Sequence, residues 1–363
     1  MKFTVTKENL KSAISKVSGI VSSKVMLPAL NNILIEAEGD TVSMTASDLE
    51  ISIKTTISAL IMEPGETTLP AKKLQQIAND LPAGDVTITT SEDEVATITC
   101  QRSLFKLHGL AAVNYQKPEE FQEDWTLTMP AIDLVKSLSK VSYAKSEDEQ
   151  RRVLNGVLFS VRGGVLTIAA TDGRRLALVE KTLEAENLAD GDIILPTKVT
   201  QELSKTLDLT GDVIIKISAS AVLFASKGTT IISKLVEGVY PNYRQVIPDN
   251  FTRQIEIPRV IFTDVLRRVS IVVQESGASV KFSLGENLLT ISAANPELGE
   301  ASEPIDIEYG DTPLDIAFNP QFLNEPLKLL ECDKIIMKFS DDLSPVEIAG
   351  DEGFLYIIMP MRG

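Results

Sequence analysis

Apolar residues recur with a helical period in six segments of the chain and with alternating or continuous spacing between them. The first stripe is formed by Leu10, Ile14 and Val17, whose spacing of three and four residues is that of one face of an amphipathic helix. Five later segments repeat it, and the pattern predicts helices over residues 7–17, 71–81, 131–141, 197–207, 260–270 and 320–330. Pro326 falls inside the last segment, where it should kink the helix or move its start downstream.

The segments between the helices have the alternating apolar pattern and the turn residues of β-strands. In the first part of the chain strands are expected over residues 32–36, 41–46, 50–56, 86–90, 95–100 and 104–107, and later parts match them. A sheet must bury one face, and two helices accompany each set of strands. The expected fold class is therefore α+β, with two helices packed on antiparallel strands in each domain.

Two sequence markers recur with one period. A strand that ends in an Asx turn occurs at Asp48, Asp172 and Asn295, at intervals of 124 and 123 residues. A proline where a strand runs into a helix occurs at positions 70, 196 and 320, at intervals of 126 and 124 residues. Independent markers with a common period predict three copies of one domain. The expected boundaries are 1–124, 125–250 and 251–363.

Composition narrows the class of protein. The 363 residues are 44% hydrophobic, and no apolar run approaches the roughly 20 residues that span a bilayer. The opening residues 1–5 lack the apolar core of a signal peptide, so we expect a cytoplasmic protein without a membrane partner. The two cysteines, Cys100 and Cys332, are expected at equivalent strand positions in two cores, and no disulfide, metal site or cofactor is predicted.

Charge is distributed unevenly between the elements. The chain has a net charge of −16, and because the six expected helices together carry +6, the remainder carries −22. The helices are thus the positive surface of an acidic protein, which fits a polyanionic partner such as nucleic acid. The alternative is that the lysines only solvate helix faces. The basic residues of this surface are Lys72, Lys73, Lys136, Lys140, Lys198, Lys205, Arg267 and Arg268.

Helix width limits how such a surface could surround DNA. Helices are about 10 Å wide, so six of them side by side around a closed circle leave a hole of only about 19 Å. Twelve helices leave about 38 Å, which admits hydrated duplex DNA. A ring lined by these helices therefore requires a dimer.

Several segments carry a resemblance to a known family. They are residues 1–5 (MKFTV), 27–32 (LPALNN), 154–159 (LNGVLF), 170–177 (ATDGRRLA), 233–244 (SKLVEGVYPNYR) and 357–362 (IIMPMR). In this order and spacing they resemble the bacterial DNA polymerase III beta subunit, the DNA sliding clamp, along the whole chain. The resemblance implies a clamp fold of three domains that forms half of a ring, and a head-to-tail homodimer that encircles double-stranded DNA without sequence specificity.

The same resemblance implies a processivity factor without enzymatic activity. Its partners would be the replicative DNA polymerase, the clamp loader and other proteins that carry a clamp-binding motif. These partners would insert the motif into a pocket between the second and third domains. The matching positions are Leu154, Thr171, Gly173, Arg174, Arg175, Leu176, Pro241, Val246, Asn319, Ile357, Met359, Pro360, Met361 and Arg362.

Physical chemistry gives these positions plausible roles. Met359 and Met361 are flexible and polarizable, which suits a pocket for different peptides, and Arg175 and Arg362 could hold peptide carbonyls or a carboxylate. The alternative is that residues 357–361 form only a core strand and that Asp172 only closes its turn.

For DNA, the resemblance maps contacts onto Lys24, Lys72, Lys73 and Lys198. The loop 146–150 is acidic, but Arg151 and Arg152 follow it at once, so the arginines are expected to face DNA and the acidic tip to turn away. Lys136, Lys140 and Lys205 complete the expected DNA-facing set because of the charge distribution.

For the dimer, the resemblance pairs the late strand of the first domain with an edge strand of the third domain in the other chain. Phe105 and Leu107 would meet Ile271 and Val272 there. Lys73 and Arg268 would face the partner's acidic run over residues 297–303. The alternative is that the four apolar residues are internal core.

The chain departs from the family pattern at Arg174, Gln245, Pro345 and Gly363, which bears on partner affinity. Other classes of function fit less well. An enzyme could use Asp48 and Asp172 as carboxylates, but they occupy the same turn in different repeats, and the single histidine is His108. A monomeric acidic scaffold that binds peptides and no DNA remains the main alternative; a native mass of one chain would favour it.

Overall fold

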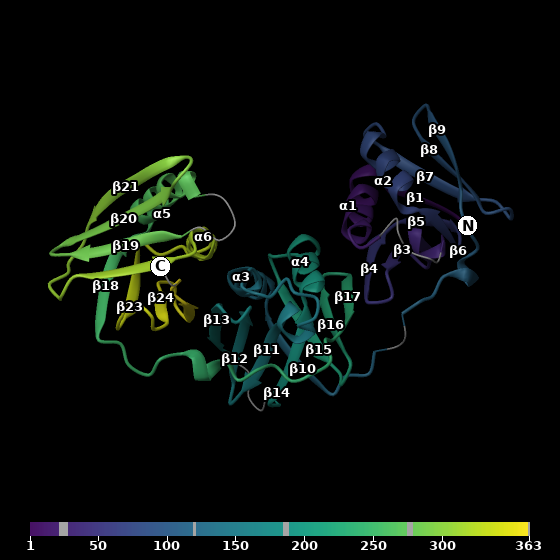
Figure 1. The fold of residues 1–363 in the computed structure, drawn as a ribbon. Coiled ribbons are helices and arrows are strands. Elements are labelled where there is room, and N and C mark those ends of the chain that lie inside the picture. The colour runs from purple at the N-terminus through teal and green to yellow at the C-terminus, as the bar shows by residue number, and fades with distance from the viewer. Residues whose placement is uncertain (22–27, 119–120, 184–188, 274–278, 362–363) are drawn as a thin grey trace. The chain divides into compact units, whose positions relative to one another are not determined.

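The helices of the chain follow the expected pattern closely. The computed structural model describes residues 1–21, 28–118, 121–183, 189–273 and 279–361 (Figure 1). Within these ranges each helix begins within one residue of its predicted start, and the first five also end within one residue of the prediction. The helices are α1 (Lys7–Ser18), α2 (Ala71–Asp80), α3 (Ala131–Ser142), α4 (Thr197–Thr206), α5 (Arg259–Val269) and α6 (Pro320–Leu327). Among the described residues no helix is long and apolar enough to cross a membrane.

The sixth helix shows how Pro326 is accommodated. Its start at Pro320 is not displaced, contrary to one of the two expectations, and it ends at Leu327, one residue after Pro326. A proline at this position lacks the N–H that would donate to the carbonyl oxygen of Phe322. The hydroxyl of Tyr356 donates to that oxygen instead, at 2.8 Å. A side chain from a strand therefore satisfies the helix backbone.

The chain forms two compact units. The first comprises Met1–Val135 and Lys198–Leu235, and the second comprises Lys136–Thr197 and Val236–Gly363. The middle repeat contributes strands to both units, because its β-strands join two different sheets.

The first unit contains two sheets, each made of antiparallel neighbours. One has the order β5 (Leu60–Glu63), β1 (Lys2–Thr6), β7 (Asp85–Thr90), β8 (Val95–Cys100) and β9 (Ser103–His108). The other has the order β10 (Trp125–Pro130), β15 (Asp212–Ile217), β16 (Ala221–Ser226), β17 (Thr229–Lys234), β4 (Ile51–Ser58), β3 (Thr41–Ser47), β2 (Asn32–Glu38) and β6 (Gly65–Pro70). The six strands expected in the first repeat correspond to β2, β3, β4, β7, β8 and β9.

The second unit has the same plan. Its large sheet has the order β14 (Gly191–Pro196), β11 (Gly156–Arg162), β12 (Val165–Thr171), β13 (Arg175–Thr182), β25 (Phe354–Ile358), β24 (Val346–Ala349), β23 (Lys334–Phe339) and β18 (Arg253–Pro258). Its small sheet has the order β21 (Gly299–Asp306), β20 (Leu288–Asn295), β19 (Val280–Gly285) and β22 (Leu314–Phe318).

Strand pairing joins one repeat to the next inside each unit. In the first unit β4 pairs with β17, with Ile53 opposite Ile231. In the second unit β13 pairs with β25, with Leu176 opposite Ile357. Each large sheet thus runs from one repeat into the next without an open edge at the joint, which satisfies the backbone donors and acceptors of both strands.

The Asx turn is the same in all three repeats. The side-chain oxygen of Asp48 accepts from the N–H of Glu50 and Ile51, at 3.0 and 2.7 Å. Asp172 accepts in the same way from the residues two and three positions later, at 2.8 and 3.1 Å. Asn295 does so at 2.9 and 3.1 Å. The periodic marker in the sequence is therefore a repeated hydrogen-bonded structure.

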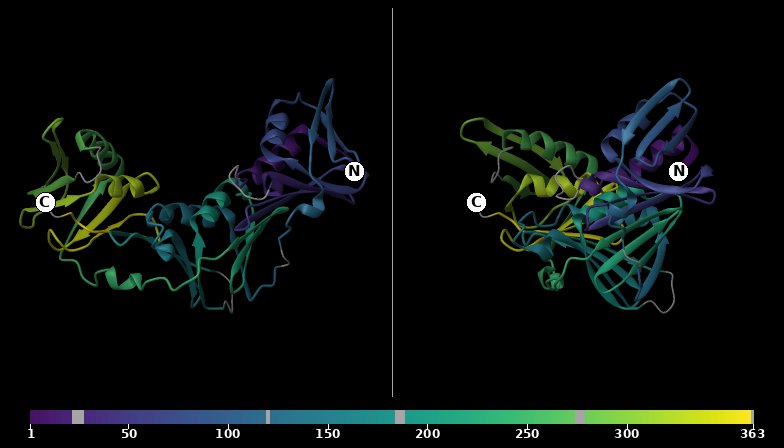
Figure 2. Two further views of the ribbon diagram at one scale, coloured as in Figure 1. Left: turned by 45° about the vertical axis from the view of Figure 1, so that its right-hand side comes forward. Right: turned by 90° about the vertical axis from the view of Figure 1, so that its right-hand side faces the viewer.

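Helices cover one face of the strands in the outer repeats. In the first repeat α1 contacts α2 and packs on β3 and β4 (Figure 1). In the third repeat α5 contacts α6 and packs on β20 and β21. Figure 2 shows the same elements from two further directions, with the blue β8–β9 hairpin at the outside of its sheet.

One expectation about the cores is wrong. Cys100 is buried in β8, as predicted, and is a free thiol. Cys332 is also free but precedes β23 and is only partly buried. Its backbone N–H donates to Asp351 at 2.8 Å, so the residue belongs to a connection and not to a core strand.

Removal of the Tyr356 hydroxyl tests the accommodation of Pro326. Tyr356→Phe should lower the free energy of unfolding by about 1–2 kcal/mol, because the partly buried carbonyl of Phe322 loses its donor. Urea unfolding measures the change. Adding Pro326→Ala to this variant supplies a backbone N–H to the same oxygen and should recover part of the loss. Equal stability of Tyr356→Phe and the unchanged protein would contradict the assignment.

Candidate partner-binding pocket

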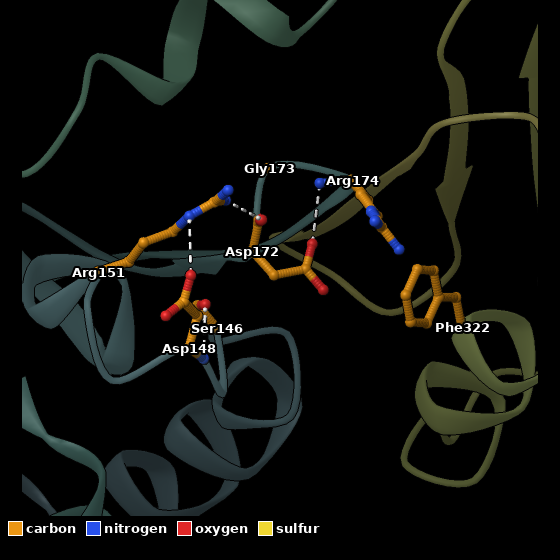
Figure 3. A pocket seen from close by; sticks show the side chains of 7 residues that line it. All are labelled: Ser146, Asp148, Arg151, Asp172, Gly173, Arg174 and Phe322. Atoms are coloured by element: carbon orange, nitrogen blue, oxygen red, sulfur yellow. Dashed lines mark hydrogen bonds and ion pairs between the residues drawn. The ribbon is translucent and has the colours of Figure 1, made fainter. Parts of the chain in front are cut away.

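A cavity of about 450 Å³ lies in the second unit (Figure 3). Its volume is within the range of ligand pockets in proteins. Figure 3 shows Arg151 and Phe322 on opposite sides of the turn at residues 172–174. The lining residues are Ser146, Asp148, Arg151, Asp172, Gly173, Arg174 and Phe322. Gly173 and Arg174 were predicted for the pocket, whereas Phe322 was missed because its spacing reads as part of the apolar stripe of α6.

Local hydrogen bonds define the turn that forms one wall. Asp172 accepts the N–H of Arg174 and Arg175, and the Thr171 hydroxyl accepts from the N–H of Gly173 at 3.1 Å. The same hydroxyl donates to the carbonyl of Arg175 at 2.6 Å. Gly173 has φ +88°, which favours glycine at this position. The predicted residues Thr171 and Gly173 thus shape the turn.

Arg175 does not point into the cavity as a free cation. Its side chain is only 6% exposed, and its Nε donates to Asp172 at 3.1 Å while Nη2 donates to the carbonyl of Tyr143 at 2.7 Å. Nη1 donates to Glu325, and the guanidinium carbon lies 4.1 Å from the ring centroid of Phe322. The expectation that Arg175 holds peptide carbonyls is therefore not supported, because its donors are already engaged within the chain.

Burial and charge act in opposite directions on this guanidinium. Burial by itself lowers the pKa of Arg175, but the carboxylates of Glu325 and Asp172 act in the opposite direction and the net effect raises the pKa. Burial raises the pKa of the Tyr143 and Tyr356 phenols. The guanidinium is thus a permanent charge among neutral phenols and two carboxylates.

An apolar cluster packs around β13, the strand that follows the turn. Leu176 and Ile357, which face each other across β13 and β25, are 1% and 2% exposed and pack with Leu158, Ala169 and Leu178. Tyr240 packs against this cluster, and its hydroxyl accepts from the N–H of Thr171 at 3.1 Å. Leu176 and Ile357 are therefore buried core residues next to the pocket and do not line it.

The residues after β25 are different. The strand ends at Ile358, and Met359 is 40% exposed, with its N–H donating to the carbonyl of Arg174 at 2.9 Å. The N–H of Met361 donates to Ala317 at 2.8 Å. The alternative that residues 357–361 form one core strand is wrong beyond Ile358, and Met359 is an accessible apolar side chain next to the turn.

The other predicted pocket residues have varied surroundings. Asn319 caps α6 by accepting from the N–H of Gln321 at 2.9 Å. Leu154 is partly buried, whereas Pro241 and Val246 are exposed. Pro360 is partly buried, and Arg362 lies outside the described residues.

One of the two arginines that follow the acidic loop lines the cavity. Asp148 accepts from the N–H of Gln150 at 3.0 Å and pairs with Arg151 Nε at 3.4 Å. Arg151 Nη1 donates to the carbonyl of Asp172 at 3.4 Å. Arg151, which was expected to face DNA, therefore lines the cavity, while Arg152 begins a short 3₁₀ segment and is exposed.

Several predicted DNA-facing lysines pair with carboxylates. Lys136 pairs with Glu331 at 2.8 Å and Lys205 with Glu202 at 2.9 Å, and Lys198 pairs with Asp48. The Lys136–Glu331 pair is exposed, and pairs of this kind contribute only about 0–1 kcal/mol and can exchange for phosphate. Lys205 is exposed and Lys198 is partly exposed, but the carboxylates of their partners Glu202 and Asp48 are largely buried and would lose their cation on such an exchange.

Lys140 is a different case because its pair with Asp351 is largely buried. Asp351 also accepts from the N–H of Glu331 and Cys332. This burial argues against a contact between Lys140 and DNA. Lys72 and Lys73 are exposed, with Lys73 donating to Gln76 at 3.3 Å, and Lys24 lies outside the described residues.

Comparison with known proteins covers the whole length of the chain. Three family models match, described as the N-terminal, central and C-terminal domains of the DNA polymerase III beta subunit, over residues 1–118, 128–242 and 244–362. The beta sliding clamp of Salmonella typhimurium is 33% identical over 367 residues, with all of both chains covered. The chain belongs to the DNA polymerase III beta subunit family.

Solved structures agree with this family assignment. The DNA polymerase III subunit beta of Pseudomonas aeruginosa has a TM-score of 0.95 at 30% identity and covers all of both chains. The sliding clamp of Bacillus subtilis has a TM-score of 0.95 at 31% identity, with 100% of this chain and 99% of that chain covered. A P. aeruginosa clamp was solved bound to griselimycin; its TM-score is 0.94 at 29% identity, with all of both chains covered. The clamp fold of three similar domains is thereby established for this chain.

The dimer contact predicted for this beta-subunit chain needs two strand edges, but Ile271 and Val272 lie in the 3₁₀ segment Ser270–Val273, which contacts β21, and not on the expected edge strand itself. β9 and β21 are terminal strands of their sheets. Phe105 on β9 is 38% exposed and Ile271 is 59% exposed, so the alternative that these residues are internal core is wrong. Leu107 and Val272 are partly buried.

Arg268 has a different partner from the one expected. It forms two hydrogen bonds with Glu303 of its own chain, at 2.8 and 2.7 Å. It was expected to face the acidic run of the other chain, residues 297–303, instead.

The Asp351 carboxyl should make stability depend on pH. Burial opposes its ionisation, but Lys140 and the two backbone N–H groups prevail and lower its pKa below 3.8. Asp351→Asn should reduce the free energy of unfolding by about 1–2 kcal/mol at pH 7. Since the folded-state pKa is lowered, the contribution of the carboxylate is full above the unfolded pKa and is lost as pH falls through the folded value.

Urea unfolding from pH 7 to pH 2.5 tests this behaviour. The difference between the two proteins should shrink only below about pH 4. Asp93→Asn, in the exposed turn between β7 and β8, is the control. A difference that is constant over the whole range would contradict the assignment.

Proposed function

We propose that this chain is a DNA sliding clamp, a ring-shaped homodimer that encircles duplex DNA and confers processivity on the replicative polymerase. The observation that carries the proposal is similarity over the full length of both chains, in sequence to beta sliding clamps and in structure to solved clamps. The proteins of this family are processivity factors and not enzymes. Its action depends on topology, so the contacts with DNA need not be sequence-specific.

The chain supplies the surfaces that this role needs. The unpaired edges β9 and β21 can each extend a sheet into a second copy of the chain, which would join two chains head to tail. Phe105 and Leu107 on one side, and Ile271 and Val272 on the other, are the proposed apolar contacts of this joint. Exposure of Phe105 and Ile271 supports it.

For DNA, we assign the exposed Lys72, Lys73 and Arg152, Lys136 in an exchangeable pair, and Lys198 and Lys205, whose own side chains are at least partly exposed beside largely buried carboxylates. The proposed domains are residues 1–124, 125–250 and 251–363, and the proposed site of action is the cytoplasm.

Partners are proposed to bind at the cavity beside the 172–174 turn. Replicative polymerase, clamp loader and other proteins with a clamp-binding motif would place apolar side chains against Met359, Met361 and Phe322. Exposure of Met359 beside the turn supports this assignment, because a methionine side chain adapts to ligands of different shape.

Topological linkage to DNA tests the ring. The protein is loaded onto a nicked circular plasmid with the host's clamp loader and ATP, separated by gel filtration, and the plasmid is then cut once. We expect retention on the circle and release after cutting. Ile271→Asp should be a monomer that is not retained, because a carboxylate cannot be buried unpaired in the joint.

Each other result of this experiment has a definite meaning. Retention after cutting, with steep dependence on salt, would indicate ordinary phosphate binding and refute the ring. No association, together with a native mass of one chain, would favour the monomeric peptide-binding scaffold. A dimer of Ile271→Asp that is retained like the unchanged protein would refute the proposed joint.

Truncation of both methionines tests the peptide pocket. Met359→Ala with Met361→Ala should weaken binding of a fluorescein-labelled clamp-motif peptide from the host's replicative polymerase by at least about tenfold, since two large apolar contacts are lost. Fluorescence anisotropy measures the affinity. The dimer should persist in gel filtration. Unchanged affinity in a folded dimer would show that peptides bind elsewhere.

A further inference from the structure

Arg175 contacts both walls of the cavity but does not itself line it. The turn at residues 172–174 forms one wall, and Phe322 on α6 forms part of the other. The guanidinium bonds to Asp172 in the turn, and its central carbon lies 4.1 Å from the Phe322 ring centroid. Glu325 follows Phe322 by three residues on the same helix, so that the ring and the carboxylate lie on one helix face and contact one guanidinium.

The helix that carries these two residues is itself held in place. Its first turn is capped by Asn319, and the carbonyl of Phe322 is bonded by the hydroxyl of Tyr356. Tyr356 lies on β25, where it pairs with Ala177 on the strand that begins at Arg175. Contacts therefore link the turn to Arg175, Arg175 to α6, α6 to β25, and β25 to the strand that follows the turn.

The carboxylates of Asp172 and Glu325 have different hydrogen-bond partners. One oxygen of Asp172 accepts the N–H of Arg174 and Arg175 and so shapes the turn, while the other binds the guanidinium. Glu325 binds the guanidinium and accepts from Gln321 at 3.3 Å, so that it reaches the turn only through Arg175. Without Glu325, the buried cation would keep the Tyr143 carbonyl and a single carboxylate, that of Asp172, so its charge would be less well compensated and its attraction would fall on the residue that shapes the turn.

We propose that Glu325 is a positioning residue of the partner-binding pocket, which acts through Arg175 to hold the 172–174 turn and Phe322 at a fixed separation. This inference rests on the proposed function, because it assigns the pocket to partner peptides. Glu325 itself does not line the cavity. Its effect on a partner is therefore indirect.

Neutralisation of Glu325 tests the proposal. Glu325→Gln should weaken binding of the same fluorescein-labelled polymerase peptide by about tenfold, whereas Glu325→Asp, which keeps the charge, should recover part of the affinity. Glu256→Gln is the matched control, since Glu256 is an exposed third-repeat carboxylate paired with Lys334 at 3.1 Å. It should bind the peptide as tightly as the unchanged protein.

A double-mutant cycle separates positioning from a general loss of structure. If Glu325 acts through Arg175, then Glu325→Gln should have no further effect on affinity in an Arg175→Gln background. Additive losses, or unchanged affinity in Glu325→Gln, would overturn the proposal. If the unchanged protein itself fails to bind the peptide, the proposed pocket function fails first, and this inference fails with it.

Hydrogen exchange supplies a second readout that does not need the Arg175 variant to fold. The amides of Arg174 and Arg175 are bonded to Asp172 and should exchange faster in Glu325→Gln, and not in Glu256→Gln. Unchanged exchange at both amides would show that the turn does not depend on Glu325 and would also overturn the proposal.

Discussion

Antiparallel pairing between the strands of successive repeats is the interaction on which the rest of the described structure depends. β4 and β13 each complete their hydrogen bonding with a strand from the following repeat, β17 and β25 respectively. These two ladders convert the sheets of separate repeats into the large sheets of the two units. The second ladder also fixes the register of Leu176 against Ile357, and thereby places both side chains in the apolar cluster that packs next to the turn.

The three Asx turns show how one local structure acquires different uses. In the first repeat Asp48 also pairs with Lys198 on α4. In the second repeat Asp172 pairs with Arg175, whose guanidinium reaches Glu325 on α6. In both cases the turn of one repeat is tied by charge to the second helix of the next. In the third repeat Asn295 makes the same backbone bonds without a charge.

The site was predictable from sequence to the extent that it is built from local structure. The resemblance to the family pointed to Thr171, Gly173 and Met359, and local structure accounts for them, since Thr171 and Gly173 form the turn and Met359 follows an apolar strand. Phe322 and the engagement of Arg175 were not predictable in this way, since an apolar residue in a helical stripe looks like core and an arginine after a turn looks like a surface cation. Lys140 is similar: its partner Asp351 is 211 residues away in the chain.

By itself the amino-acid sequence determined the six helices, six strands of the first repeat but not β1, β5 and β6, the period of the Asx turns and the family, because each depends on side-chain periodicity or on hydrogen bonds between near neighbours. Only the tertiary structure decided which repeats share a sheet, that α6 stops after Pro326, and that Arg175 is buried between Phe322, Asp172 and Glu325. These features depend on partners distant in sequence, whose bonds replace water at a backbone carbonyl, a strand edge or a charge. No local pattern encodes which distant group will supply them.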